Sequence, residues 1–129
     1  MINIDKDESF SEILSRFDDG SHKSIAVGAG WSELVKECHK RLSSFDPHYK
    51  VLQIKEKFGG LRYYFSPSVP VYTNIMHDRI IELEKKSFTI CEVCGSSGRL
   101  RKTKQTNWNK TLCDKHADKE KYDDAVQPR

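Results

Sequence analysis

Two short pairs of metal-ligand residues constrain the fold of this chain more than any other feature. Cys91 and Cys94 are separated by two residues, and Cys113 and His116 repeat that spacing after 18 intervening residues. A gap of two residues lets both side chains of a pair converge on one ion, and two such pairs about 15–20 residues apart are typical of a zinc site. Three thiolates and an imidazole suit tetrahedral zinc. The spacing therefore predicts one Zn²⁺ bound by these four residues.

A redox pair and a disulfide are the alternatives for the two cysteines at 91 and 94. A lone C-x-x-C beside a βαβ pattern would favour thioredoxin chemistry, but this chain has no such pattern and has a second pair. Residues 1–8 lack the basic and apolar regions of a secretory signal. We therefore expect a cytoplasmic protein, and in that reducing compartment paired cysteines are more often metal ligands.

The four predicted ligands favour a structural zinc over a catalytic one, because a closed shell leaves no position for water. Treble-clef nucleases need a catalytic His between the two ligand pairs, and residues 95–112 contain none. Zinc deaminases need H-x-E and P-C-x-x-C, but Cys91 follows Ile90 and His77 precedes Asp78. We expect no enzymatic activity and no small-molecule substrate.

Upstream of the cysteines, the pattern predicts an α+β body over residues 1–88. Apolar residues at helical spacing predict helices at about 9–17, 31–45 and 72–87, the first with a Ser9-x-x-Glu12 capping box. The apolar stripes are Phe10, Ile13, Leu14 and Phe17, then Trp31, Leu34, Val35, Cys38 and Leu42, then Tyr72, Met76, Ile80 and Leu83. Because Cys38 lies on such a stripe, we expect a buried thiol that packs in the core and binds no metal.

Residues 50–66 predict a β-hairpin in which Gly59-Gly60 forms a two-residue type I′ turn. This register pairs Phe58 with Leu61, Glu56 with Tyr63, and Ile54 with Phe65. It assigns one face to the core (Leu52, Ile54, Phe58, Leu61, Tyr63 and Phe65) and the other to a basic surface (Lys55, Lys57, Arg62 and Tyr64). Residues 24–27 are a short strand or an apolar loop. Gly28-x-Gly30 is interpreted as a turn, because the further residues of a phosphate loop are absent.

The basic residues gather near the cysteines. Residues 85–121 carry 10 Lys and Arg against 4 Asp and Glu, whereas residues 1–84 carry 11 against 13. Five of these cations surround Trp108: Arg99, Arg101, Lys102, Lys104 and Lys110. Cations interleaved with an aromatic residue are typical of nucleic-acid binding. Alternatively, the cations balance the net negative charge of a Cys₃His zinc centre, and Trp108 covers the small core of the zinc module.

Several sequence motifs are similar to those of a known protein family. The chain from about residue 30 to 117 contains GWSELV, VLQIKEKFGGLRYYFS, CEVCG with a following Gly-x-Leu-Arg, and TLCDKHA. It resembles an uncharacterised family of small proteins of bacteria and their phages, which implies an accessory role as an inhibitor, immunity protein or defence-related binding protein. Residues 91–125 resemble a treble-clef zinc finger. We therefore expect a zinc-binding module at 89–125 packed on the body, followed by a tail at 126–129.

These observations together predict a non-enzymatic, zinc-stabilised binding protein whose partner is another protein. Arg62, Tyr64 and Trp108 are the candidate contacts, because Arg and aromatic side chains dominate binding hot spots. The alternative is nucleic-acid binding through the basic hairpin 99–110. No stretch approaches the ~20 apolar residues that span a bilayer, so no membrane association is expected.

Overall fold

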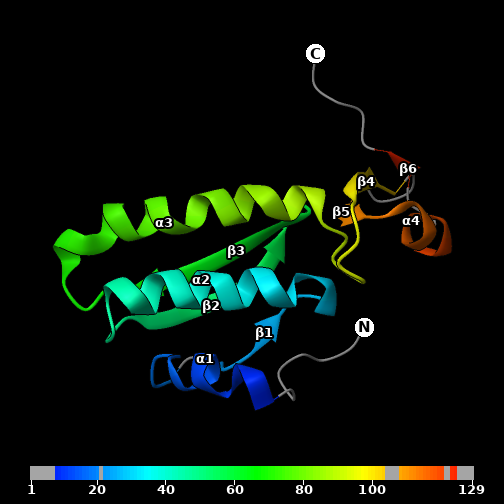
Figure 1. Cartoon of the computed structure of the whole chain (residues 1–129). Coiled ribbons are helices and arrows are strands. Elements are labelled where there is room, and N and C mark those ends of the chain that lie inside the picture. The colour runs from blue at the N-terminus through cyan, green and yellow to red at the C-terminus, as the bar shows by residue number, and fades with distance from the viewer. Residues whose placement is uncertain (1–7, 21, 104–107, 121–122, 125–129) are drawn as a thin grey trace.

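The computed structural model describes residues 8–20, 22–103, 108–120 and 123–124. The chain is a mixed fold of helices and two small sheets. Two long helices lie side by side over one face of a three-stranded sheet, and the segment with the predicted zinc ligands lies at one end of them (Figure 1). Among the described residues, no helix combines the length and the apolarity that crossing a membrane requires.

The two long helices match the predicted periodicity. Helix α2 spans Ser32–Phe45 and helix α3 spans Thr73–Lys86, each flanked by a 3₁₀ turn. The apolar side chains that they turn toward the sheet are buried, namely Leu34, Val35, Cys38, Leu42, Met76, Ile80 and Leu83. The prediction that Cys38 packs in the core is confirmed, because its side chain is 0% exposed.

The first helix is shorter than predicted. A 3₁₀ turn at Glu8–Phe10 leads into α1, which spans only Ser11–Ser15. The helix begins after Phe10, which makes no side-chain capping bond, so the capping-box start was predicted one residue too early. It ends early because Arg16 O accepts a hydrogen bond from Val51 N, and Asp18 N donates to Val51 O. Pairing with the sheet thus replaces the last helical turn.

The sheet has the order β1-β2-β3, with β1 at Ile25–Ala26, β2 at Lys50–Lys57 and β3 at Gly60–Ser66. Strand β1 is parallel to β2, and β2 is antiparallel to β3. The predicted hairpin exists, but its turn lies one residue earlier than predicted, so the strand residues next to it pair two residues away from their predicted partners: Ile54 pairs with Tyr63 and not with Phe65. Lys57 pairs with Gly60, so the turn residues are Phe58 and Gly59, both with positive φ.

Tertiary contacts explain this register. A Cβ on Gly60 would overlap the ring of Phe88, so this glycine is needed within the strand and not in the turn. An irregularity between Val51 and Gln53 also changes which side chains face the core. Val51 is fully buried, whereas Leu52 and Phe58, both assigned to the core, are 42% and 67% exposed. Of the predicted core face, Ile54, Leu61 and Tyr63 are buried and Phe65 is half-buried.

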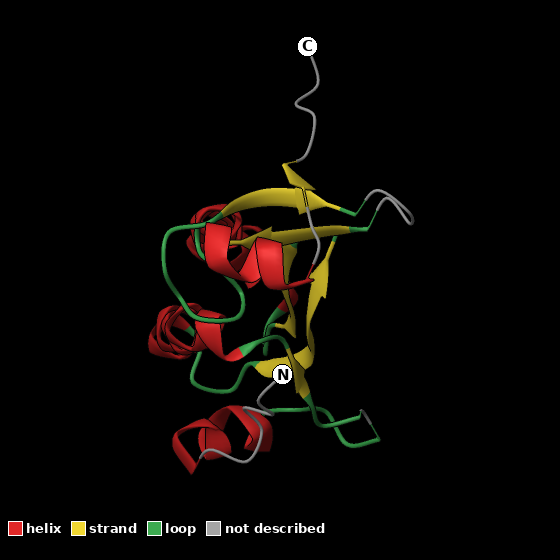
Figure 2. Ribbon diagram, turned by 90° about the vertical axis from the view of Figure 1, so that its right-hand side faces the viewer, coloured by secondary structure: helices red, strands yellow, loops and turns green. Residues whose placement is uncertain are grey.

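No described helix covers the outer face of this sheet. Seen from the side, α2 and α3 lie to the left of the strands, and only strands and loops lie to the right (Figure 2). Ala26, Leu52 and Tyr64 are exposed on this outer face. An antiparallel sheet commonly packs one face on the core and presents the other to water.

The segment after α3 forms a second, smaller sheet. Strand β4 spans Arg99–Lys102 and pairs antiparallel with β5, which spans Asn109–Leu112. Helix α4 follows at Asp114–Glu120, and β6 at Asp123–Asp124 pairs with the other edge of β4. The order along the chain is thus a Cys-containing turn, a hairpin and a helix.

Candidate metal centre

The four predicted ligands come together. The Sγ atoms of Cys91, Cys94 and Cys113 and a ring nitrogen of His116 all lie within 4.8 Å of one another. A tetrahedral site with Zn–S bonds of about 2.3 Å has sulfur–sulfur edges of about 3.8 Å. Cys94 Sγ lies 3.8 Å from Cys113 Sγ, and His116 Nδ1 lies 3.7 Å from Cys91 Sγ and 3.1 Å from Cys113 Sγ. The residues therefore fit one zinc ion, and the four cysteines of the chain are free thiols.

Backbone hydrogen bonds shape the turn that carries the first pair. Gly95 N donates to Cys91 O and Cys91 N donates to Ser96 O, which closes a tight loop around Cys94. Gly95 has a φ of +84°, a conformation that glycine adopts without steric cost. The second pair lies at the start of α4, where Ala117 N donates to Cys113 O. Each ligand pair is thus positioned by hydrogen bonds of its own local backbone.

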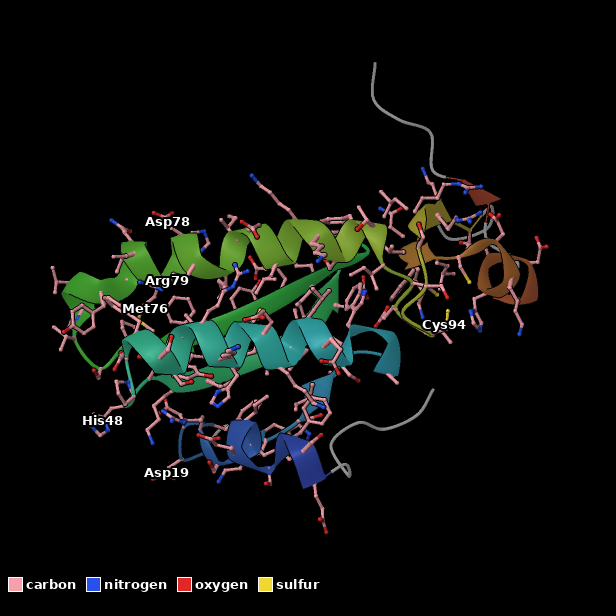
Figure 3. The ribbon with its side chains drawn as sticks, viewed as in Figure 1. Asp19, His48, Met76, Asp78, Arg79 and Cys94 are labelled. Atoms are coloured by element: carbon pink, nitrogen blue, oxygen red, sulfur yellow. The ribbon has the colours of Figure 1, made fainter. Side chains whose placement is uncertain are left out.

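The first two thiols have different environments. Burial raises the pKa of Cys91. Hydrogen bonds from Ser96 lower the pKa of Cys94 to about 6, and this residue lies at the surface (Figure 3). A thiolate at Cys94 is therefore accessible near neutral pH, and thiolates are the form that binds zinc.

The loop before α2 supports the first ligand pair, a role that the sequence analysis did not foresee. Gly30 N donates to Glu92 O at 2.7 Å, and Gly28 N donates to the carboxylate Oε2 of Glu92 at 2.9 Å. A Cβ on Gly30 would overlap Cys91 O and lie 2.6 Å from Gly95 N. The Gly28-x-Gly30 motif thus allows close backbone approach to the metal-ligand turn, in addition to turning the chain as predicted.

The hairpin tip supports the second sheet. Thr111 Oγ1 donates to Gly59 O at 2.7 Å, and a Cβ on Gly59 would overlap Leu100. Trp31, which is fully buried, donates from Nε1 to Ile90 O at 2.8 Å. The metal-ligand segment therefore packs directly on the body, and the GW, FGG and CEVCG motifs of the sequence meet at this junction.

Two of the five hairpin cations interact with the module itself. Arg101 is 5% exposed, and it donates to Leu112 O and to the carboxylate of Asp114 at 2.7 Å. Arg99 lies 3.1 Å from the same carboxylate. The bond from Arg101, with help from Arg99, lowers the pKa of Asp114. Arg101 is therefore too buried to contact a phosphate, contrary to its assignment to a nucleic-acid surface.

The other described residues of the hairpin that were candidates for partner or nucleic-acid contacts are more exposed to solvent. Lys102 and Lys110 are half-buried, and Lys104 lies outside the described residues. Trp108 is 66% exposed, so it does not cover the core of the metal-ligand segment. Of the candidates on β3, Tyr64 is 38% exposed and Arg62 is half-buried, and both lie on the outer face of the sheet. The structure thus separates Trp108, on the second sheet, from Arg62 and Tyr64, on the first.

A buried polar chain inside the body also went unpredicted. His39 Nδ1 lies 2.7 Å from the hydroxyl of Tyr49, which lies 2.7 Å from the hydroxyl of Tyr63. Both tyrosines are almost fully buried, and burial raises the pKa of each. Glu12 lies 3.5 Å from His39 Nε2. Hydrogen bonds between distant segments of this kind have no local sequence signal.

Comparison of the chain with protein families, with curated proteins and with solved structures gave no match.

Proposed function

We propose that Cys91, Cys94, Cys113 and His116 hold one structural Zn²⁺ in a treble-clef module, and that the protein is a non-enzymatic binding protein whose partner is another protein. The observation that carries the metal assignment is the convergence of four ligand atoms within 4.8 Å. All four positions of a tetrahedral zinc are then filled by the protein, which leaves no site for an activated water. Because the proposal needs reduced thiols, it places the protein in the cytoplasm.

Zinc in this position stabilises the fold instead of reacting. The segment made of the metal-ligand turn, the second sheet and α4 has few buried apolar residues of its own: Cys91, Leu112 and Ala117 form a small cluster. A core of that size does not order a segment without further support, and metal ligation is the usual support in small modules. Zinc binding would therefore fix the second sheet against the hairpin tip of the body.

The outer face of the first sheet supports the assignment of a protein partner. A groove of about 620 Å³ lies on it, lined by His22, Ser24, Ala26, Leu52, Gln53, Ile54 and Tyr64. Leu52 and Tyr64 are partly exposed there. Exposed apolar and aromatic side chains beside an arginine, here Arg62, are typical of protein interfaces. Trp108 is a candidate for a second contact on the other sheet.

Nucleic-acid binding remains the second candidate function. Its support is the pair Lys102 and Lys110 beside the exposed Trp108. The burial of Arg101 and the ion pair between Arg99 and Asp114 reduce the positive charge that the hairpin offers to phosphates. A protein partner accounts for the exposed apolar face as well, and we therefore prefer it.

Affinity capture from native host cells, with and without nuclease treatment, tests the preference. The tagged wild-type chain is compared with a Tyr64→Ala, Arg62→Ala double variant. We expect partner proteins that survive nuclease treatment and are lost with the double variant. If the captured proteins are lost after nuclease treatment and are unaffected by these two substitutions, nucleic-acid binding is the better assignment.

A further inference from the structure

The hairpin turn of the body contains a residue that does not suit its conformation. Phe58 has a φ of 54°, in the left-handed region, at the first position of the two-residue turn Phe58-Gly59. Type I′ turns favour Asn or Asp before Gly at this position, and a bulky residue with positive φ is an outlier.

Packing does not explain the aromatic ring. Phe58 is 67% exposed, and its one ring contact among the described residues is with Lys57, whose Nζ lies 5.6 Å from the ring centroid. The fold thus holds a strained backbone and an exposed ring where asparagine would remove both features. Strain that the fold does not need is found most often at functional sites.

The strand behind this turn carries a second unfavourable feature. Lys55 on β2 is paired directly with Arg62 on β3. Like charges opposite each other destabilise a sheet. In the part of the chain that the structure describes, no ion pair involves Lys55, Lys57 or Arg62.

Lys55, Lys57, Arg62 and Tyr64 share the outer face, and Phe58 follows Lys57 at the turn. Tyr64 pairs with Gln53, Arg62 with Lys55, and Lys57 precedes Phe58 in the turn. Positions 55 and 57 alternate with the buried Ile54 and so lie on the outer face. These five residues therefore make a strip with an aromatic ring at each end and three cations between them.

We propose that this strip (Lys55, Lys57, Phe58, Arg62 and Tyr64) binds an acidic segment of a partner protein that has an apolar residue at each end. The inference rests on the proposed function and specifies its surface. The cations match two or three carboxylates of the partner, Phe58 and Tyr64 contact its apolar ends, and Leu52 extends the contact into the groove. From residue 53 to residue 58 the strip is about 16 Å long, which fits an extended peptide of about five residues.

The arrangement favours a peptide over a single-stranded nucleic acid. Nucleic-acid platforms stack successive bases on neighbouring rings, whereas here the two rings lie at opposite ends of the strip. The groove beside the strip has the exposed aliphatic residues Ala26 and Leu52 in its lining. These side chains suit an apolar side chain of a protein.

The test uses a displayed library of random dodecapeptides selected against the zinc-loaded full chain. We expect selected peptides with acidic residues between apolar ones, bound at least about tenfold more weakly by Arg62→Glu and by Phe58→Asn, where tenfold is about 1.4 kcal/mol. Lys40→Glu, a charge reversal on the exposed surface of α2, is the matched control and should bind as the wild type does.

The Phe58→Asn variant also separates function from structure. Asparagine tolerates the left-handed conformation, so we expect its melting temperature to rise by a few degrees while binding falls. A lower melting temperature would show that the ring serves the fold, and would overturn the inference. Selected peptides without acidic residues, or tighter binding of an oligo-dT of about 15 nucleotides, would overturn it as well. If host proteins still bind in the capture experiment when the strip is altered, the inference fails and the proposed function stands.

Discussion

Gly30→Ala adds one methyl group where the body meets the metal-ligand turn, and we expect it to be strongly destabilising. The new Cβ would overlap Cys91 O and lie 2.6 Å from both Glu92 O and Gly95 N. All three are backbone atoms of the metal-ligand turn, so no side-chain rotation relieves the contact. The loop before α2 and the metal-ligand turn would have to separate.

The separation breaks two hydrogen bonds, from Gly30 N to Glu92 O and from Gly28 N to the Glu92 carboxylate. Each bond contributes about 1 kcal/mol, and a buried carboxylate that loses a donor costs a further ~1–3 kcal/mol. We therefore expect the free energy of unfolding to fall by about 3–5 kcal/mol. That is a large part of the ~5–15 kcal/mol that stabilises a typical domain.

Urea unfolding followed by circular dichroism measures this loss, and metal analysis of the same samples shows whether zinc is retained. Gly20→Ala is the control, because an added Cβ at Gly20 has no atom within 4 Å; its φ of 87° is positive, unlike that of Gly30. It should cost only about 1–2 kcal/mol from the left-handed backbone. If Gly30→Ala were no more destabilising than this control, the reasoning about the junction would be refuted.

Three further predictions concern the interior. Cys38→Ala should keep the full metal content and cost about 1–2 kcal/mol in urea unfolding; loss of metal would show that Cys38 is a ligand. Arg101→Gln should destabilise the zinc module by about 2 kcal/mol, because it removes charged donors from Leu112 O and Asp114; equal stability would refute a structural role. Burial lowers the pKa of His39 below its ordinary value, against the opposing effect of Glu12, so the folded state favours the neutral imidazole. The free energy of unfolding should therefore fall as pH decreases from about 7 through the unfolded pKa of about 6.5, and His39→Gln should reduce that slope.

The parts of the fold that the sequence predicted are those set by local spacing. The apolar stripes of α2 and α3 repeat every three or four residues, and the structure buries them as expected. The metal-ligand pairs are similar, because a gap of two residues brings two side chains together whatever surrounds them. The sequence could predict the convergence of Cys91, Cys94, Cys113 and His116 for that reason.

The parts that were missed depend on contacts between distant segments. The hairpin register was wrong because Gly60 is required by Phe88, which lies beyond α3, and not by the turn. Helix α1 ends early because Val51 pairs with the residues that follow it, Arg16 and Asp18. Gly28 and Gly30 contact Glu92, more than 60 residues later. No local pattern around any of these residues encodes its distant partner.

The metal content of the purified native chain tests the central claim most directly. Native mass spectrometry of the wild type should give one zinc ion per chain, and Cys113→Ser should lose it, while Cys38→Ala keeps it. Because binding of the ion is coupled to folding of the module, chelation should also expose apolar surface. A wild-type chain that is fully folded without metal, with Cys91 and Cys94 joined in a disulfide, would contradict the account.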